Sequence, residues 1–342
     1  RLRAAWLGCL LLSACAAAPD PAPTLPPTTS TLVCDRDYLP ALRELVRGAQ
    51  EELLAAQWEL HPSGTTAAIE DLLAEAADRG VTVRLLLDDE VDANVAAVER
   101  LLERGVQARM DERPDTRVHS KVLVADGRDA LVGSTNWSST SIDFNHECNL
   151  RLLEGAGPAY VGDWLRGVID GDAGRTEPST TQDGPAIALV DDDLLPSLLD
   201  RLEAATERVD FVLYATFLQP KNPSAPTMQV FQAIADAQAR GLTVRGVADW
   251  SDWNHGNNKR NADAVAWLRE RDVPMRWEDP RINTHAKAFL IDDVLQVQSA
   301  NVSTSGFSSN REVGAVTPES GTIAAFSAWF DPLWDGSTEE PK

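Results

Sequence analysis

The sequence predicts an α/β protein with two pseudo-symmetric α/β/α sandwich lobes that share one site at the lobe interface. Three observations carry this prediction: helix-like and strand-like segments alternate, the same order of segments occurs twice, and one polar motif occurs once in each half. The 342 residues suit about two domains, and 43% of them are apolar, which is enough for sizeable cores.

In the first half, helices are predicted where apolar residues recur every three or four positions, and strands where they alternate or run together. Arg79-Gly80-Val81 ends one helix and starts a strand, and Gly105 stops the next helix. The predicted elements are a helix over 37–56, a strand over 55–60, a helix after Thr65 or Thr66, a strand over 81–87 and a helix over 93–104.

The second half repeats this order. Arg240-Gly241-Leu242 matches the helix-to-strand junction of the first half, and Trp329 matches Trp164 at a separation of 165 residues. This repetition predicts two lobes of one fold. The predicted elements are a helix over 194–207, a strand over 209–216, a helix over 228–240 and a strand over 242–248.

A polar motif recurs between the halves. It reads His-x-Lys, then Asp after four further residues, then Ser and Asn beyond a turn, and finally Glu. Corresponding positions lie 166 residues apart as far as the Asp and 165 apart from the Ser onward, so the second turn is one residue shorter. The first copy is His119, Lys121, Asp126, Ser134, Asn136 and Glu147; the second is His285, Lys287, Asp292, Ser299, Asn301 and Glu312.

These residue types suit one chemistry. Side chains two apart on a strand share a face, so the His and Lys of each copy would project together. Two Lys and two Asn would hold a group with several anionic oxygens, such as a phosphodiester. Two His would supply a nucleophile and a general acid near neutral pH, and each Glu would orient an imidazole by its second nitrogen. This chemistry requires no metal.

The doubled motif resembles that of the phospholipase D superfamily, over roughly residues 33–336. The resemblance implies lobes of the phospholipase D type, no cofactor, and a phosphohistidine intermediate. It implies that His119 attacks phosphorus and that His285 is the general acid and base. It also implies that Asp126 and Asp292 are structural. Residue Gln298 departs from the match, because the first copy has Gly133 there. We therefore expect the phosphate-binding residues of the second copy, the second phosphate cradle, to be arranged differently in detail.

The N-terminal segment has a basic start and an apolar run that ends in Leu12-Ser13-Ala14-Cys15. It resembles a bacterial lipoprotein signal, with lipid on Cys15; an ordinary secretory signal or a short anchor is the alternative. Lipidation would place the protein in the cell envelope, on the periplasmic or extracellular face. The predicted boundaries are a signal peptide at 1–14, lipidated Cys and Ala/Pro/Thr tether at 15–32, lobe one at 33–171, connector at 172–184, lobe two at 185–336 and tail at 337–342.

Two cysteines remain in the predicted lobes. These are Cys34 and Cys148. Outside the cytoplasm they would form a disulfide, whereas two buried free thiols are an equal alternative.

The leading functional hypothesis is a membrane-tethered phospholipase D that hydrolyses or exchanges the head-group ester of a glycerophospholipid. The alternatives are a nuclease with the same motif, a relative of cardiolipin synthases, and a degenerate scaffold that binds phosphate or lipid. The signal peptide contains two of the 31 basic residues, so cleavage would leave 29 against 53 acidic ones, a net charge of −24. Such a charge opposes binding to nucleic acid. We expect a monomer, because both motifs lie in one chain, and a zwitterionic phospholipid substrate at a membrane surface.

Overall fold

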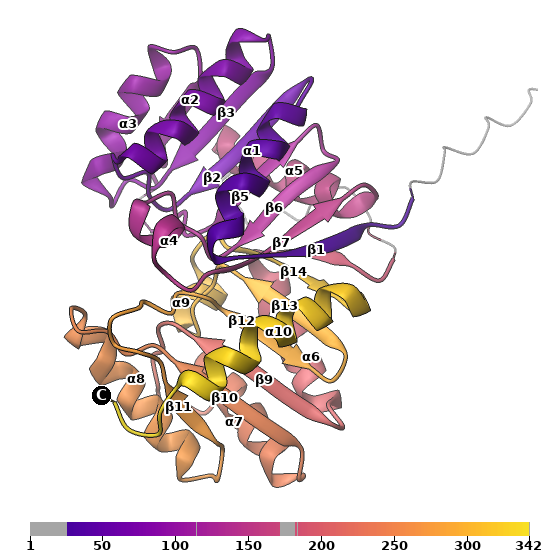
Figure 1. Ribbon diagram of the computed structural model, residues 1–342, viewed down its shortest axis with the longest axis vertical. Coiled ribbons are helices and arrows are strands. Elements are labelled where there is room, and N and C mark those ends of the chain that lie inside the picture. Colours follow the sequence, from indigo (N-terminus) through magenta and orange to yellow (C-terminus); the bar gives the residue numbers. More distant parts are fainter. Residues whose placement is uncertain (1–25, 114, 172–181, 183, 342) are drawn as a thin grey trace, which may run out of the picture.

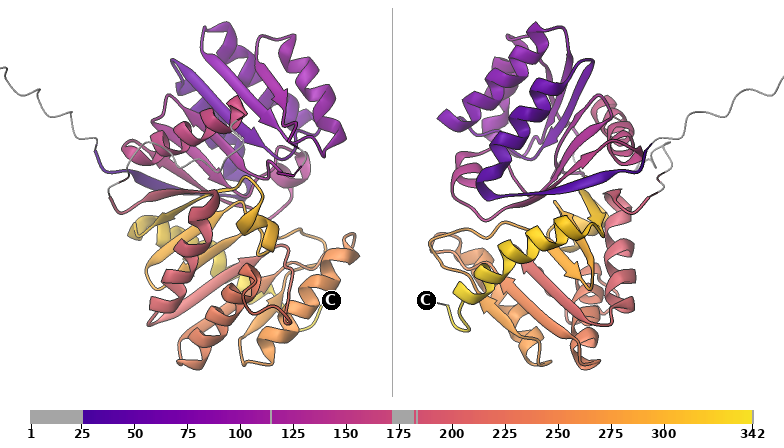
Figure 2. Two further views of the ribbon diagram at one scale, coloured as in Figure 1. Left: turned by 180° about the vertical axis from the view of Figure 1, so that it is seen from behind. Right: turned by 45° about the vertical axis from the view of Figure 1, so that its right-hand side comes forward.

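The computed structural model describes residues 26–113, 115–171, 182 and 184–341. Two seven-stranded sheets, one in each lobe, stand one above the other in Figure 1. Several helices cover the outer face of each sheet, and one helix of each lobe, at residues 156–170 and 320–336, packs on the inner side at the lobe boundary (Figure 2). The predicted α/β class and the two lobes are therefore confirmed.

The sheet of lobe one is mixed. Three strands at one edge are parallel to each other, and the remaining neighbours are antiparallel. In spatial order the strands are β1 (Thr29–Cys34), β7 (Cys148–Leu153), β6 (Asp129–Gly133), β5 (Lys121–Ala125), β2 (Glu52–Gln57), β3 (Thr82–Leu87) and β4 (Gln107–Met110).

Lobe two has the same topology, strand for strand, which confirms the predicted repeat. Its spatial order runs from the parallel edge to the antiparallel one. The strands are β11 (Met275–Trp277), β10 (Thr243–Ala248), β9 (Arg208–Leu213), β12 (Ala288–Ile291), β13 (Val294–Gln298), β14 (Val313–Thr317) and β8 (Ile187–Val190).

Ten α-helices occur in the described residues, five in each lobe, and a one-turn 3-10 helix follows both β1 and β8. None of them is both long enough and apolar enough to cross a lipid bilayer. The helices of lobe one are α1 (Tyr38–Gly48), α2 (Gly64–Asp78), α3 (Asp92–Leu102), α4 (Ser139–Asp143) and α5 (Ala156–Asp170), and those of lobe two are α6 (Leu194–Ala204), α7 (Pro226–Ala239), α8 (His255–Arg269), α9 (Thr304–Ser308) and α10 (Ser320–Gly336).

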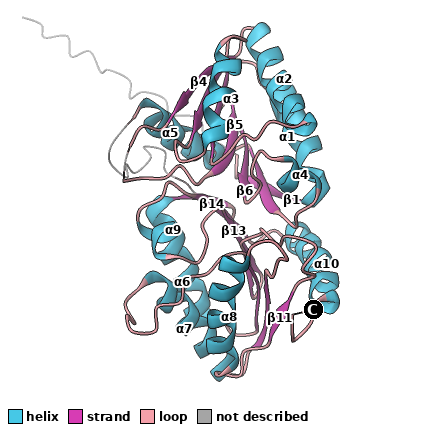
Figure 3. Ribbon diagram, turned by 90° about the vertical axis from the view of Figure 1, so that its left-hand side faces the viewer, coloured by secondary structure: helices cyan, strands magenta, loops and turns pink. Residues whose placement is uncertain are grey.

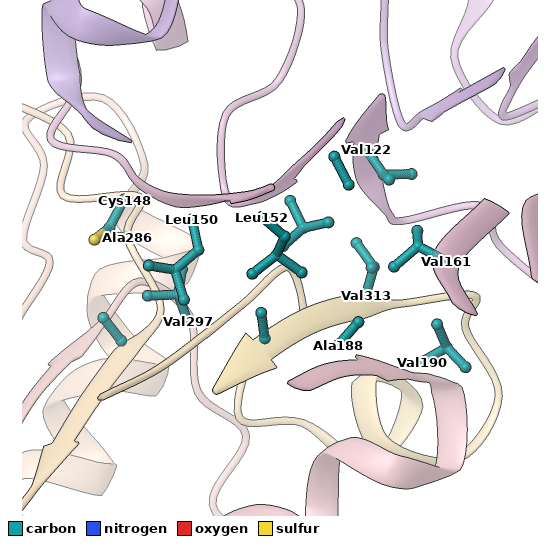
Figure 4. Packing of buried hydrophobic residues seen from close by; sticks show 14 of the residues in the cluster. Val122, Cys148, Leu150, Leu152, Val161, Ala188, Val190, Ala286, Val297 and Val313 are labelled. Atoms are coloured by element: carbon teal, nitrogen blue, oxygen red, sulfur yellow. The ribbon is translucent and has the colours of Figure 1, made fainter. Parts of the chain in front are cut away.

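The hydrophobic core has three layers. One lies under α1, α2 and α3, one under α6, α7 and α8, and the third lies between the two sheets. In this central layer Leu150 and Leu152 of lobe one face Val297 and Val313 of lobe two, and all four are fully buried (Figure 4). Truncating one such leucine to alanine costs about 2–5 kcal/mol of folding free energy. The lobes therefore share a core and hold a fixed relative position.

Two predicted boundaries are wrong. Residues Thr28 to Leu32, which we assigned to the tether, belong to lobe one: Thr28 and Ser30 are buried, and β1 pairs with β7. The Pro/Thr composition suggested a tether, but β-branched residues also favour strands. The predicted tail likewise contributes Thr338, which exchanges two backbone hydrogen bonds with Trp277. The signal peptide and most of the connector lie outside the described residues.

Candidate active site

The two motif copies meet in one pocket of about 570 Å³ between the lobes. Both motif histidines, His119 and His285, and both motif asparagines, Asn136 and Asn301, line this pocket. Residues of α4 and α9 belong to its lining, and Figure 3 shows where these two helices lie. The prediction of a single site at the lobe interface is therefore confirmed.

Backbone hydrogen bonds across the interface fix the segments that carry the histidines. The amides of His285 and Ala286 donate to the carbonyl of His146, at 2.9 and 3.0 Å. The Arg311 amide donates to the Arg117 carbonyl at 2.7 Å, and the matching bond joins the His146 amide to the Asn283 carbonyl at 2.9 Å. Each motif histidine thus lies beside a strand end of the opposite lobe.

The histidines pair with carboxylates crosswise. Nδ1 of His119 lies 2.9 Å from Oε1 of Glu312, and Nδ1 of His285 lies 3.0 Å from Oε2 of Glu147. Each pair therefore joins one lobe to the other, and neither lobe contains a complete pair. An ionised carboxylate only accepts hydrogen bonds, so Nδ1 carries the proton and Nε2 keeps its lone pair.

Each carboxylate has its own supports. Ser134 Oγ donates to Glu147 Oε2 at 2.5 Å, and Asn145 Nδ2 donates to Oε1 at 3.1 Å. In lobe two the same pattern of bonds runs from Ser299 and Asn310 to Glu312. Both carboxylates are fully buried, so these donors replace lost hydration and fix the orientation in which the carboxylates hold the imidazoles.

The electrostatics of the pairs favour neutral imidazoles in the absence of substrate. Burial lowers the pKa of His119, although Glu312 partly offsets the effect. Burial lowers the pKa of His285 further, to about 4. Burial alone would raise the pKa of both glutamates, but the histidines and lysines outweigh it, and both pKa values are lowered. The resting site thus holds two carboxylates and two imidazoles with free Nε2 lone pairs.

The motif lysines are deeply buried. Lys121 and Lys287 are 2% and 1% exposed, and each Nζ donates to the carbonyl of the histidine two residues before it. Burial lowers the pKa of Lys121 to about 8 and that of Lys287 to about 7, against the attraction of the nearby glutamates. An anionic phosphate in the pocket would hold both lysines in the charged form.

The motif aspartates lie away from the pocket. Asp126 accepts hydrogen bonds from the backbone amides of residues 50–52, at 2.8–2.9 Å. Asp292 does the same for residues 206–208, at 2.8–3.0 Å. Each carboxylate thereby fastens the start of a central strand, β2 or β9. This is the placement of a structural residue.

The motif asparagines have unused hydrogen-bonding capacity. The Oδ1 atoms of Asn136 and Asn301 are buried, and among the described residues neither has a hydrogen-bond partner. Both side chains line the pocket, and a carboxamide presents either donors or acceptors, depending on its flip. Unsatisfied buried amides facing a pocket are suited to a polar ligand.

The departure at Gln298 is compensated on the neighbouring strand. Gly133 pairs with Asn149 in lobe one, whereas Gln298 pairs with Gly314 in lobe two. A Cβ on Gly133 would lie 2.6 Å from Asn149, and a Cβ on Gly314 would lie 3.0 Å from Gln298 Cβ. Each lobe thus has one amide side chain and one glycine in the same pair of positions, in opposite order.

The two amides support equivalent turns. Asn149 Nδ2 donates to Thr135 Oγ1 at 2.8 Å, and Gln298 Nε2 donates to the Ala300 carbonyl at 3.0 Å. Both Thr135 and Ala300 precede the motif asparagine directly. The expected difference between the cradles is therefore one of which strand supplies the support.

Further site residues lie just past the central strands, and the motif did not predict them. The Trp58 ring lies 5.5 Å from the His119 ring, and the Tyr214 ring lies 4.3 Å from the His285 ring. Both aromatic residues directly follow a strand end, one residue after β2 and one after β9. Trp58 and Tyr214 lie 156 positions apart in the sequence, whereas the motif copies lie 165 apart. Their equivalence is therefore seen only when the strands before them are aligned.

Two buried aspartates position the segments before the histidines. Asp88 Oδ2 accepts from the Val118 amide at 2.6 Å, and Asp249 Oδ1 accepts from the Thr284 amide at 2.8 Å. Each amide belongs to the residue just before a motif histidine. Burial raises the pKa of Asp88 to about 6 and that of Asp249 to about 7. These carboxyl groups follow β3 and β10, where strand ends converge on the pocket.

Comparison with known proteins places both lobes in one family. The family model described as "Cardiolipin synthase, PLD-like domain" matches residues 42–156 and 198–334. These two segments contain both copies of the motif and most of both sheets. The match therefore covers well over half of the chain.

Curated relatives match shorter segments. A mitochondrial cardiolipin hydrolase from Chlamydomonas reinhardtii is 30% identical over 86 residues, which are 25% of this chain and 38% of that protein. Cardiolipin synthase B from Salmonella typhi is 32% identical over 114 residues, 31% of this chain and 27% of that protein. The matched parts span well under half of either relative.

The fold also occurs in a solved structure. The crystal structure of phosphatidylserine synthase from Haemophilus influenzae superposes with a TM-score of 0.70 over 90% of this chain and 86% of that one. The sequences are 11% identical, so the likeness is one of fold. The two-lobe arrangement is thus shared across nearly the full described chain.

Proposed function

The chain belongs to the phospholipase D superfamily, and on this basis we propose that it hydrolyses or exchanges the head-group ester of a glycerophospholipid. One observation supports this above others: both motif histidines and both motif asparagines line a single pocket. Behind this lining, each histidine pairs with a glutamate, and a buried lysine bonds to its backbone carbonyl. The set offers a nucleophile, a proton donor and a phosphate cradle without any further group.

In the proposed first step, Nε2 of His119 attacks phosphorus and forms a P–N bond. The P–O bond to the head-group alcohol breaks, and His285 donates a proton to the departing oxygen. His285 is neutral in the absence of substrate, and the bound phosphate anion would favour the imidazolium form that this step requires. Glu312 stabilises the charge that develops on His119, since its carboxylate accepts a hydrogen bond from Nδ1–H. The products of this step are the free head-group alcohol and a phosphatidyl group on His119.

In the second step, neutral His285 takes a proton from water or from an acceptor alcohol. The oxygen attacks phosphorus, and the P–N bond breaks. Water gives phosphatidic acid, and an alcohol gives a new phosphodiester. Lys121 and Lys287 would neutralise the anionic oxygens in both transition states, and their burial strengthens that interaction.

We propose a zwitterionic head group, because the pocket lining differs between the lobes. Glu59 and Ala215 both stand two residues past a central strand, and of these two only Glu59 lines the pocket. Its carboxylate is 19% exposed, and Trp58 lies next to it in the sequence. A carboxylate and an aromatic ring together suit an ammonium group.

A second candidate is phosphatidyl transfer to another lipid alcohol, or hydrolysis of cardiolipin. The names of the matching family model and of the curated relatives favour it. The net charge of −22 for the printed chain weighs against strongly anionic membranes and against nucleic acid.

We also propose that the protein acts as a monomer, anchored in the cell envelope through lipid on Cys15. The anchor would hold the pocket near a bilayer and raise the effective concentration of lipid. Cys15 and the lipoprotein-like signal lie outside the described residues, so this proposal rests on the sequence alone.

The test compares substrates in one buffer that contains EDTA. The full chain is assayed on vesicles of phosphatidylethanolamine or phosphatidylcholine, on phosphatidylglycerol and cardiolipin, and on single- and double-stranded DNA. We expect phosphatidic acid and free head group from the zwitterionic lipids. Preferential turnover of phosphatidylglycerol or cardiolipin would select the second candidate. Equal cleavage of DNA would overturn the lipid assignment, and activity restored only by added metal would contradict the metal-free mechanism.

A further inference from the structure

Cys34 and Cys148 face each other across two neighbouring strands. Cys34 ends β1 and Cys148 begins β7, and the two are directly opposed in the antiparallel ladder. Directly opposed residues in such a ladder have Cα atoms roughly 4.5–5.5 Å apart, within the range of about 4.4–6.8 Å that disulfides require. The two sulfur atoms lie 3.0 Å apart. The backbone therefore needs no rearrangement for a bond between them.

The equivalent positions of lobe two show that packing alone does not call for cysteine. There, β8 ends at Val190 and β14 begins at Val313, and these two valines are opposed in the same register. All four side chains belong to the central core layer. An apolar pair thus satisfies this position, and lobe one has two thiols in contact instead.

The strand that Cys34 ends has a ladder partner on one side only. β1 is the edge strand of its sheet and the first element of the described chain. The residues next to the cysteines, Asp35 and Glu147, form their own pair: the Asp35 amide donates to the Glu147 carbonyl at 3.1 Å, and Asp35 Oδ1 accepts from the Glu147 amide at 2.9 Å. Glu147 in turn holds His285.

We propose that Cys34 and Cys148 form a structural disulfide that fastens the edge strand β1 beside the carboxylate of Glu147. The bond would link residues 114 positions apart and so remove much of the freedom of the unfolded chain. A covalent link at this point would also keep the Asp35–Glu147 pair closed when the edge of the sheet fluctuates.

The chemistry requires a disulfide-bearing oxidant, either a small-molecule disulfide or a thiol–disulfide oxidoreductase. One cysteine thiolate attacks a sulfur of the oxidant to give a mixed disulfide, and the second cysteine then displaces the oxidant thiol. Two protons and two electrons leave the pair, and the oxidant becomes two thiols. Burial raises the pKa of Cys34 in the folded chain, so the exchange takes place while β1 is still undocked.

The experiment refolds the full chain in a mixture of reduced and oxidised glutathione, and in parallel in excess reductant. Peptide mapping without reduction should recover a Cys34–Cys148 cross-linked peptide about 2 Da lighter than its two thiol halves, since two hydrogens are lost. Reduction should then lower the thermal midpoint by about 5–10 °C.

The control is Cys34→Val/Cys148→Val, which copies the valine pair of lobe two. This double variant should fold, lose all dependence of the midpoint on redox conditions, and keep its activity at low temperature. Recovery of both residues as free thiols after oxidative refolding would overturn the proposal. So would a cross-link from either residue to Cys9 or Cys15, or an equal redox dependence in the double variant.

Discussion

His285 of lobe two is held through its Nδ1 by Glu147 of lobe one, at 3.0 Å. The reciprocal pair of His119 and Glu312 has nearly the same distance, 2.9 Å. Since each pair spans the interface, the relative position of the lobes determines the geometry of both.

Neutralising a pairing carboxylate should impair catalysis through the opposite lobe. We expect Glu147→Gln and Glu312→Gln each to lower kcat by roughly 10²- to 10⁴-fold with little change in KM, because the imidazole loses its orientation and its charge partner. Exposed Glu103, replaced by Gln, is the matched control. Wild-type kcat in either pairing variant would show that the carboxylates are not needed.

The two histidines should differ in what their loss abolishes. We expect His119→Ala to prevent any covalent phosphoenzyme, detected by mass spectrometry of acid-quenched protein. His285→Ala should still form the intermediate from a substrate with an activated leaving group, such as a p-nitrophenyl ester, which needs no proton. The reverse pattern would exchange the two roles.

The buried Lys287 should lower the stability of the folded protein, although it serves catalysis. Burial lowers its pKa from 10.5 to about 7 in the folded chain. Between these two values the unfolded chain binds a proton that the folded chain does not, so this group makes unfolding easier as pH falls from 10.5 to 7. We therefore expect Lys287→Met to raise the thermal midpoint more at pH 6 than at pH 10, with loss of activity. An equal shift at both pH values would contradict the buried charge.

Gly133 of lobe one should not tolerate a larger side chain. A Cβ on Gly133 would lie 2.5 Å from the Cys148 carbonyl oxygen, so Gly133→Ala should cost about 1–3 kcal/mol or more of folding free energy. Gly48→Ala is the control, because nothing lies within 4 Å of its Cβ. Denaturant unfolding of both variants measures the difference, and equal stabilities would show that the strand can shift.

Glu59 should select the head group. We expect Glu59→Gln to lower kcat/KM for phosphatidylethanolamine about tenfold, the magnitude of one lost charge-assisted hydrogen bond. Turnover of phosphatidylglycerol, which lacks an ammonium group, should change little. A uniform loss on both lipids would assign Glu59 a structural role instead.

The sequence predicted the two lobes and their meeting point because the motif repeats at a nearly constant separation. It did not predict which glutamate pairs with which histidine, since a pattern along the chain does not state how two lobes are turned toward each other. The predicted helix over 37–56 was also wrong beyond Gly48: residues 52–57 form β2. Their apolar run fits both periods, and burial in the sheet decides between them.

The site residues outside the motif could not be predicted for another reason. Asp88 and Asp249 act on backbone amides, so no neighbouring sequence pattern marks them. Trp58 and Tyr214 are different residue types at equivalent positions. Such residues become visible only when the strands are superposed in space.

The exchanged glycine and amide pairs carry a consequence for how such a chain can change over time. Gly133 pairs with Asn149, and Gln298 pairs with Gly314, so each pair has one glycine and one amide side chain. Two amide side chains in one pair would clash, and two glycines would leave the space unfilled. A single substitution at one of these positions therefore meets a barrier that two coordinated ones avoid. The halves of this protein are free to drift apart in composition, but at the cradles they must do so two residues at a time.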